Sequence, residues 1–564
     1  MPTLFKSLAE LLEKVESTKK RLEITGMTAD FLKRLEAEEV EPAVSMVLGR
    51  AFPKWSQKTL EVSWVTLSGV LQRVTGVDWD VFREAFAGIG DVGAAVKAVF
   101  EKTNVKKQAL LLEKTLTINE VRRLLQAIAG TAGSGSREKK ERLITALLSQ
   151  ASPVEAKYLM KIFVGEMRTG LHEGLMEQAV AKAFEAPLAT VQKASMAMGD
   201  IGEVAAIAKT KGEKGLSQID FQVFRPVKPM LAQTADTVSE ALTAHEDRTA
   251  FEYKYDGARV QIHKQGDEVR VFSKRLTDAT QSLPEVVEAV KVNIKADEAI
   301  VEGEVIAVNE RGHPIPFQHL MRRFKRIREV RGMAEKIPVK LYLFDVLFLN
   351  GENLIALPYL QRRIVLAENA GEIPLTTQLV TNKKKQAKKF LNEAMDAGHE
   401  GLMAKKLDGA YTPGIRGKRW LKIKPVLEPL DLVITAAEYG YGRRHGWLSD
   451  YYLAALDQAT GEFLNVGKTF KGLTDAEMVE MTQRLKELAV REEHNLVVVL
   501  PKVVVEVAYN EIQKSRKYKS EMALRFARIS RIRADKSAED ADTIEKVREI
   551  YERQFAKKGK YKAY

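Results

Sequence analysis

Residues 252–259 read EYKYDGAR and stand where a predicted strand ends in a turn. We expect a lysine (Lys254), a carboxylate and an arginine (Arg259) to converge there beside a glycine. A lysine is a nucleophile only when its amine is deprotonated, and burial or neighbouring cations lower its pKa. We therefore expect Arg259 and a bound divalent ion to lower the pKa of Lys254. Because a lysine in so short a motif is more often an exposed residue of a turn, the interpretation depends on the rest of the chain.

Charged and aromatic residues recur inside apolar runs farther along the chain. Residues 301–304, VEGE, put two carboxylates in an apolar strand, where ionised groups are costly unless they bind a cation or a sugar hydroxyl. Phe344 offers a ring for stacking on a base, and Glu400 offers a hard oxygen ligand for Mg²⁺. Lys422 and Lys424 share one face of a predicted strand and suit a phosphate. Each feature alone is more often structural, but together they form a site with a nucleophile, metal ligands, a stacking ring and phosphate-binding cations.

The pattern of apolar and polar residues changes twice along the 564 residues, so we expect a multidomain protein. Residues 1–220 form a predicted all-α domain, with apolar residues at spacings of three and four. Residues 221–425 alternate short β-type runs with helical stretches, which predicts an α+β domain. Residues 426–564 read as about five strands around a helix near 473–490, which is compatible with a β-barrel of the OB-fold type, followed by a C-terminal helix and a basic tail.

The composition excludes several functional classes. The chain has no cysteine, which rules out disulfides, thiolate zinc sites, iron–sulfur clusters and a cysteine nucleophile. The eight histidines include no HExxH pair, so a histidine-based metalloprotease is excluded. The formal net charge is +13, and residues 501–564 carry +7 against +3 for residues 1–220, which favours a polyanionic partner. No apolar run approaches the roughly 20 residues of a membrane helix, so we expect an intracellular protein that faces nucleic acid and no membrane.

Residues 130–142, GTAGSGSREKKER, join a Gly/Ser-rich turn to the start of a predicted helix. Three cations follow the turn directly: Arg137, Lys139 and Lys140. Free backbone N–H groups beside cations suit a phosphate, although a solvated helix preceded by a loop explains the segment equally well. Helix starts are predicted on both sides of this segment, by a capping box at Thr117 and by a cap with a first-turn proline at Ser152.

The motifs, in this order, resemble those of the covalent nucleotidyltransferases and, within them, the ATP-dependent DNA ligases. KYDGAR is similar to the motif of the adenylated lysine, VFSKRLTDAT to the next motif, and VEGEVIAV and LYLFDVL to two central strands. EGLMAKK is similar to the metal motif, WLKIKP to the last motif of the core, and residues 524–547 to the arginine-rich motif of the ligase OB domain. Residues 116–170 resemble the helical DNA-binding domain of the larger ligases of archaea, eukaryotes and some bacteria. The resemblance covers nearly the whole chain.

The resemblance implies that Lys254 is the nucleophile that takes AMP from the co-substrate ATP. Phe344 would stack on adenine, and Glu304 and Glu400 would serve the ribose and the metal. The nucleotide-binding residues that it implies are Glu252, Arg259, Lys274, Arg275, Glu304, Phe344, Arg416, Lys422, Lys424, Arg525 and Arg528. Those implied close to the leaving pyrophosphate are Arg531, Asp535 and Lys536. Two positions depart from the pattern: Lys274 replaces a frequent arginine, which leaves the contact open between it and Arg275, and Ala527 replaces a frequent proline.

The implied mechanism begins with attack of the lysine on the α-phosphate of ATP, with Mg²⁺ or Mn²⁺ and the cations neutralising the growing charge. AMP then passes to the 5′-phosphate of a nick in duplex DNA, and the 3′-hydroxyl attacks to seal the strand, in replication, repair or recombination. The first step needs the arginine-rich motif over ATP, whereas the later steps need that space for DNA. We therefore predict a hinged OB domain, with the hinge near residues 424–429. The helical domain would contact the duplex backbone through Arg137, Lys139 and Lys140.

Other classes compete with a DNA ligase. An RNA-capping guanylyltransferase uses the same lysine chemistry with GTP, but the long helical domain disfavours it, and an RNA ligase is the closer competitor. NAD-dependent ligases are disfavoured because their cysteine zinc module is impossible here. A catalytically inactive nucleic-acid-binding protein is disfavoured by the intact charged residues of the site.

We expect a monomer that embraces nicked double-stranded DNA, and the sequence identifies no sliding-clamp partner. The absence of a long leader before the helical domain favours a prokaryotic cytoplasm. The run Lys383 to Lys385 reads as the solvated face of a helix over residues 383–396 rather than as a nuclear signal.

Overall fold

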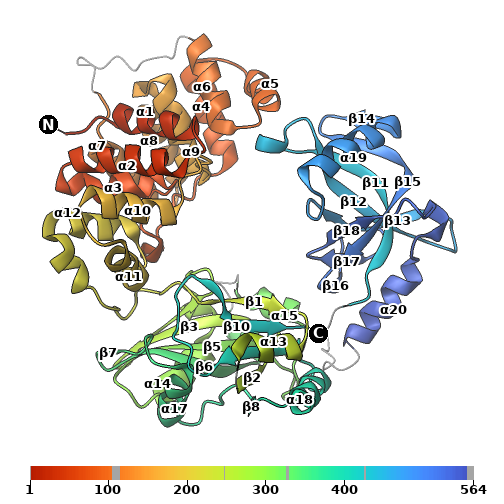
Figure 1. Cartoon of the computed structure of the whole chain (residues 1–564). Helices are drawn as coiled ribbons and strands as arrows, with labels where there is room; N and C mark the ends of the chain where they lie inside the picture. The colour runs from red at the N-terminus through yellow and green to blue at the C-terminus, as the bar shows by residue number, and fades with distance from the viewer. Residues whose placement is uncertain (1, 104–114, 247, 325–329, 425–426, 556–564) are drawn as a thin grey trace.

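A computed structural model describes residues 2–103, 115–246, 248–324, 330–424 and 427–555. Its elements form three units that follow one another along the chain, namely a helical unit, a central unit with two large sheets, and a C-terminal sheet unit (Figure 1). The predicted sequence of fold classes is confirmed. Within the described ranges, no helix combines the length and the apolar character needed to cross a membrane.

The helical unit is built from amphipathic helices around one apolar core. Both predicted helix starts are confirmed: the Thr117 hydroxyl accepts a hydrogen bond from the N–H of Glu120 (3.2 Å), and Ser152 and Glu155 form a capping box. Its helices are α1 (Phe5–Glu16), α2 (Arg21–Arg34), α3 (Ala37–Val47), η1 (Lys54–Ser56), α4 (Trp64–Thr75), α5 (Trp79–Ile89), α6 (Val92–Lys102), α7 (Ile118–Ala129), α8 (Ser136–Gln150), α9 (Pro153–Val164), α10 (Glu173–Ala183), α11 (Leu188–Met198) and α12 (Ile201–Ser217). The last helix ends close to residue 220, the predicted limit of the all-α domain, and Ala208 and Leu216 still face the core.

The central unit contains two five-stranded sheets, with the orders β1-β10-β9-β2-β8 and β4-β3-β5-β6-β7. Apart from the parallel pair β1 and β10, neighbouring strands are antiparallel. The strands are β1 (Leu231–Ala235), β2 (Thr249–Tyr253), β3 (Ala258–Gln265), β4 (Glu268–Ser273), β5 (Glu298–Ala307), β6 (Val339–Leu349), β7 (Glu352–Asn353), β8 (Gln378–Thr381), β9 (Leu402–Lys406) and β10 (Arg416–Ile423). The helices are α13 (Val238–His245), η2 (Thr280–Ser282), α14 (Pro284–Asn293), α15 (Phe317–Phe324), α16 (Val330–Lys336), α17 (Tyr359–Asn369) and α18 (Lys384–Asp396). Residues 254–257 cross from β2 in one sheet to β3 in the other, which places Lys254 between the sheets.

The C-terminal unit is an antiparallel sheet that packs on α19. Its strand order is β13-β12-β11-β15-β14, with β18 also paired to β15 and a separate hairpin of β16 and β17. The strands are β11 (Leu430–Tyr439), β12 (Leu448–Leu456), β13 (Phe463–Thr469), β14 (Ala489–Glu493), β15 (Leu496–Ala508), β16 (Glu511–Lys514), β17 (Met522–Arg525) and β18 (Arg528–Ile532). The helices are η3 (Gly442–Arg444), α19 (Asp475–Glu487), η4 (Ala538–Asp540) and α20 (Ile544–Phe555). The helix predicted near residues 473–490 is confirmed as α19, and the predicted C-terminal helix is confirmed as α20. The strand β14 was not predicted from the sequence.

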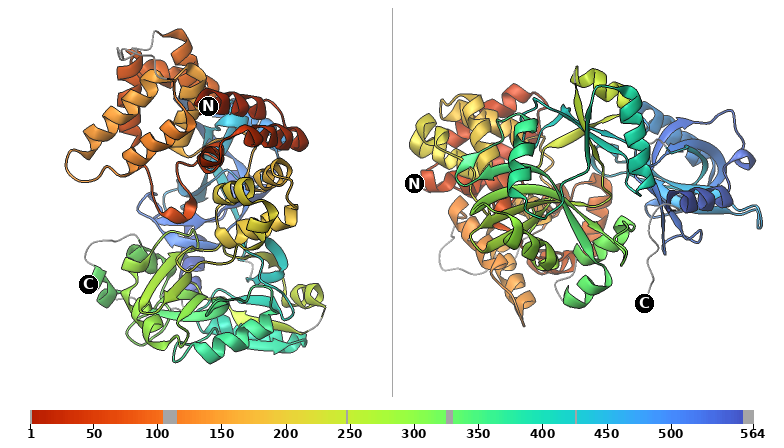
Figure 2. Two further views of the ribbon diagram at one scale, coloured as in Figure 1. Left: turned by 90° about the vertical axis from the view of Figure 1, so that its left-hand side faces the viewer. Right: turned by 90° about the horizontal axis from the view of Figure 1, so that it is seen from below.

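The three units are arranged as a ring in which each touches the other two (Figures 1 and 2). The Gln57 side chain donates to the carbonyl of Leu276 (2.6 Å) and joins the helical unit to the central unit. Gln318 donates to the Gln513 side chain (3.0 Å) and joins the central unit to the C-terminal unit. The ring of Tyr441 stacks on Phe86, with 5.7 Å between centroids, and closes the circle. The predicted hinge region, residues 424–429, lies partly outside the described residues, because 425 and 426 are not described.

Candidate active site

A cavity of about 280 Å³ lies where the chain crosses between the two sheets of the central unit. Its described lining residues all belong to the central unit, between Met230 and Lys422. The sequence-predicted residues among them are Glu252, Lys254, Arg259, Lys274, Glu304, Phe344, Arg416 and Lys422. The structure therefore brings together most of the residues that the sequence assigned to one site.

The backbone fixes Lys254 beside Glu400. The N–H of Lys254 donates to the carbonyl of Gly401 (2.8 Å), and the N–H of Glu400 donates to the carbonyl of Lys254 (2.9 Å). The Lys254 amine donates to the Glu400 carboxylate, which also pairs with Lys424 at 2.7 Å. Burial, the largest single influence, lowers the pKa of Lys254, but the charge and hydrogen bond of Glu400, together with the charges of Glu304 and Asp256, raise it by more in total, so the pKa is raised. The lowering of this pKa that is expected from Arg259 and a bound divalent ion stays a prediction.

Glu304 is a partly buried carboxyl on β5 that lies opposite Arg259 in the sheet register. Burial raises its pKa from 4.5 to about 8, although the charges of Lys254 and Arg259 lower it. The folded protein therefore holds this carboxyl largely protonated at neutral pH. A ligand that donates hydrogen bonds to the carboxylate or carries positive charge stabilises its ionised form. Both a ribose hydroxyl and a metal ion have this property.

An aromatic and cationic wall forms one side of the cavity. Phe344 and Trp420 meet edge to face, with 6.0 Å between ring centroids, and the Arg259 guanidinium lies 5.3 Å from the Phe344 ring. Arg259 donates to Glu302 (2.7 Å) and to the carbonyl of Met230 (2.6 Å). Its Nε is buried and has no hydrogen-bond partner among the described residues. This wall offers an aromatic surface for a base and one buried donor for a ligand.

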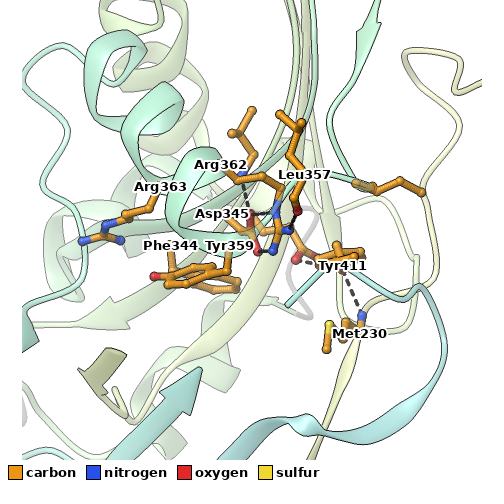
Figure 3. Close-up of polar contacts among 12 residues, drawn as sticks. Met230, Phe344, Asp345, Leu357, Tyr359, Arg362, Arg363 and Tyr411 are labelled. Carbon is orange, nitrogen blue, oxygen red and sulfur yellow. Dashed lines mark hydrogen bonds and ion pairs between the residues drawn. The ribbon is translucent and has the colours of Figure 1, made fainter. Parts of the chain in front are cut away.

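A buried ion pair lies next to Phe344, between β6 and α17. Asp345 accepts two hydrogen bonds from Arg362, at 2.8 and 3.0 Å, and both side chains are fully buried. Because Arg362 lies on α17 and Asp345 on β6, this pair fixes α17 against β6, and Arg362 also donates to the carbonyl of Leu357 (2.6 Å) just before α17 (Figure 3). Sequence reasoning singled out Phe344 here, whereas Arg362 carried no motif signal.

Glu252 occupies the floor of the cavity with all its acceptor positions engaged. Its Oε1 accepts from the Tyr359 hydroxyl and from Gln378 (3.1 Å). Its Oε2 accepts from Thr376 (2.9 Å) and pairs with Lys405 (2.9 Å), which is itself buried. The predicted contact of Glu252 with the nucleotide stays a prediction. Sequence reasoning missed Lys405, although the residue stands inside the quoted stretch EGLMAKK.

Lysine and arginine side chains gather along another part of the cavity. Besides Arg259 in the wall and Lys405, which is paired with Glu252, the lining cations are Lys254, Lys274, Arg416 and Lys422. Burial lowers the pKa of Lys422, and the charges of Arg416 and Lys424 lower it further. Cations that repel one another in this way attract an anion. Lys274 lines the cavity and Arg275 is not among the lining residues, so the geometry favours Lys274 for a nucleotide contact.

The arginines of the C-terminal unit lie elsewhere. Arg525 pairs with Glu511 at 3.3 Å and lies over the ring of Phe317, 5.2 Å from its centroid. Arg528 is exposed on β18, and neither residue lines the cavity. Contact of these arginines with a nucleotide in the cavity therefore requires the C-terminal unit to move.

The cationic turn of the helical unit is only partly exposed. Arg137 and Lys139 are exposed at the start of α8, and Arg137 pairs with Glu141 at 2.9 Å. Lys140 is 6% exposed, and its amine donates to the carbonyl of Leu60 (2.9 Å). Because this amine is buried and holds the loop before α4, the structure contradicts the predicted phosphate contact of Lys140.

Comparison with known proteins assigns the family. The profile described as "ATP dependent DNA ligase domain" matches residues 229–424, which include the whole cavity. The profiles "DNA ligase N terminus" and "ATP dependent DNA ligase C terminal region" match residues 4–181 and 444–536. The chain belongs to the ATP-dependent DNA ligase family. It is therefore an enzyme that uses ATP and binds DNA, and nick sealing through an adenylate intermediate is the mechanism of this family.

Relatives of this ligase match over its full length. DNA ligase 1 of Korarchaeum cryptofilum is 47% identical, over 98% of this chain and 99% of the relative. The DNA ligase of Thermococcus onnurineus is 44% identical, over 99% of both chains. A solved structure titled "Pmar-Lig_PreS3" has a TM-score of 0.59 at 17% identity and covers 93% of this chain and 99% of its own, which supports the ligase fold.

Proposed function

We propose that ATP binds in the central cavity of this ligase and that Lys254 takes up its AMP. The convergence of Lys254 with Lys274, Arg416 and Lys422 on one cavity carries the proposal. The cations attract the triphosphate, and the wall of Phe344 and Trp420 receives the base. Separation of the Lys254 amine from Glu400 removes the main contributions that raise its pKa, so burial, which lowers this pKa, has a larger effect. The free amine can then attack the α-phosphate, and the cations stabilise the charge that develops as pyrophosphate leaves.

Glu304 and Glu400 are the proposed ligands of Mg²⁺ or Mn²⁺. Within the described ranges, no group of three or more acidic, histidine or cysteine side chains forms a metal-binding cluster. Two carboxylates nevertheless fit Mg²⁺, which typically binds through one or two carboxylates together with substrate phosphates and water. When bound, the ion would supply positive charge at the phosphates of ATP.

The test of this proposal is incubation with Mg²⁺ and either α-labelled ATP or α-labelled GTP, followed by denaturing separation. We expect label from ATP alone, and transfer of that label to nicked duplex DNA. Label from GTP would support the capping alternative, and transfer only to nicked RNA would support an RNA ligase. Lys254→Ala must abolish labelling, whereas Lys274→Ala should weaken ATP binding without abolishing the covalent label.

The proposed partner is nicked double-stranded DNA, held in the ring of a monomer. Three units that contact one another in a circle can surround a duplex, and the exposed cations Arg137 and Lys139 of α8 can contact its phosphates. The prokaryotic cytoplasm remains the proposed location.

The contribution of Arg137 and Lys139 to DNA binding is separable from adenylation. Arg137→Ala with Lys139→Ala should weaken nick binding, reduce its salt dependence and leave self-adenylation unchanged. Lys384→Ala with Lys385→Ala removes the same charge from an exposed face of α18 and serves as the control. Equal salt dependence in both double variants would exclude the helical turn from phosphate contact.

A further inference from the structure

One carboxylate of the C-terminal unit, Asp431, binds two cations of the arginine-rich segment at once. Asp431 accepts hydrogen bonds from Arg533 at 2.9 and 3.1 Å and from Lys536 at 2.7 Å. Asp431 and Arg533 are each 13% exposed, so water screens their attraction only weakly. The same guanidinium also donates two hydrogen bonds to the Asp535 carboxylate, at 2.7 and 2.9 Å. Most donor positions of Arg533 are thus occupied inside its own unit.

The backbones on both sides of this contact are fixed. Asp431 exchanges two hydrogen bonds with Asp542, both at 2.8 Å, at the point where the chain enters the C-terminal unit. The N–H of Arg533 donates to the carbonyl of Val504 (2.9 Å). Only the side chains can therefore exchange partners without disrupting the sheet.

The arginine-rich segment does not line the cavity in this arrangement. The described residues that line the cavity all belong to the central unit, and β18 lies in the C-terminal unit, apart from both central sheets (Figure 1). In the mechanism that the sequence resemblance implies, the cations of this segment reach ATP during self-adenylation and leave it when the nick is sealed. A cation that is already paired with a carboxylate binds a phosphate less well, because the two anions compete for the same donors.

From these contacts we infer that Asp431 is a positioning residue that holds Arg533 and Lys536 in the DNA-sealing arrangement and competes with the phosphates of ATP for them. This inference rests on the proposed function of the cavity and adds a carboxylate outside it. Sequence reasoning named Lys536 but passed over both Asp431 and Arg533. The inference predicts effects of opposite sign on two steps of one reaction.

The test compares Asp431→Asn with the unchanged ligase in two single-turnover assays. The first measures self-adenylation over a range of ATP concentrations without DNA, and the second measures sealing of a nick that already carries AMP on its 5′-phosphate. Asparagine keeps the size of the side chain and removes its charge. We expect the variant to need roughly three- to tenfold less ATP for half-maximal adenylation, which corresponds to the loss of one charge-assisted contact. We expect sealing of the adenylated nick to slow by a similar factor.

Two further variants separate positioning from structural damage. Asp431→Glu keeps the charge and should behave more like the unchanged ligase. Glu480→Gln removes an exposed carboxylate of α19 and should have little effect on either step. Parallel slowing of both steps in Asp431→Asn, with a lower melting temperature, would overturn the inference, and so would two unchanged rates or slower self-adenylation alone. If the unchanged ligase itself took up no AMP, the proposed function would fail instead.

Discussion

At the residue scale, the site depends on carboxylates whose ionisation is set by what lies beside them. Glu400 stays ionised because Lys254 and Lys424 both pair with it, and their charges lower its pKa in spite of burial. Glu304 has no such pair of lysines and its pKa is raised to about 8 by burial. Two glutamates of one site are thus held in different protonation states, which suits one for a cation and the other for a ligand that must first displace a proton.

Glu304 should make the stability of the ligase depend on pH. Its pKa in the folded protein, about 8, lies above the ordinary value of 4.5, so the folded state binds the extra proton between these values. The free energy of unfolding contributed by this group is therefore present at low pH and is lost as pH rises through about 8. Glu304→Gln, which is always neutral, should raise the melting temperature more at pH above 8 than near pH 5, while slowing self-adenylation.

Differential scanning fluorimetry across this pH range measures the effect. Glu310→Gln, at an exposed position after β5, is the matched control and should show no pH-dependent gain. An equal shift of melting temperature at both ends of the range in Glu304→Gln would show that Glu304 is ionised in the folded protein.

At the scale of elements, the position of Phe344 depends on the contact between β6 and α17. Arg362→Met would leave Asp345 as a buried carboxylate without its partner, which typically costs about 3–5 kcal/mol. Asp345→Leu combined with Arg362→Met should recover most of that loss, because no buried charge then remains unpaired. Chemical denaturation measures the free energy of unfolding of the three variants. A double variant as unstable as Arg362→Met would refute the buried-charge explanation.

Local signals in the sequence predicted elements better than they predicted contacts. The caps at Thr117 and Ser152 and the helix over residues 383–396 are encoded by neighbouring residues, and the structure confirms all three. The contact of Lys140 could not be predicted in this way. Its partner Leu60 is 80 positions away in the sequence, and such a distant contact leaves no periodic pattern. The partners of Glu252 are similarly remote, since Tyr359 lies 107 positions away.

The order of motifs predicted the cavity, whereas the ionisation inside it depended on distances that no sequence pattern gives. Lys254 and Glu400 are 146 positions apart, and their ion pair raises the pKa of the lysine. The proposed domain limits, at residues 220/221 and 425/426, stay predictions.

At the scale of the whole molecule, the ring explains how one chain can hold a duplex and still rearrange. The contact of Phe86 with Tyr441 joins the first unit to the last through two rings, and Tyr441 is 55% exposed. The stacked rings contribute about 0.5–1.5 kcal/mol, and Gly90 and Arg168 of the first unit approach Gly442 and His445 of the last unit at the same contact. Opening at this contact would admit DNA and would free the C-terminal unit to swing.

Tyr441→Ala should therefore favour the open ring. We expect a larger radius of gyration for the free protein by small-angle scattering, faster dissociation from nicked circular DNA, and self-adenylation at least as fast as in the unchanged ligase. Tyr518→Ala, in the turn between β16 and β17 of the same unit, is the control. A radius of gyration of the protein that is the same with and without nicked DNA would contradict both the open ring and the predicted hinge.

The central claim is that Lys254 is the residue that carries AMP between ATP and the nick. Peptide mapping by mass spectrometry, after incubation with ATP and Mg²⁺ but without DNA, tests it most directly. We predict a single AMP adduct on the peptide that contains Lys254, absent in Lys254→Ala and lost from the protein when nicked DNA is added. An adduct on another residue, or sealing of nicks by Lys254→Ala, would contradict the account.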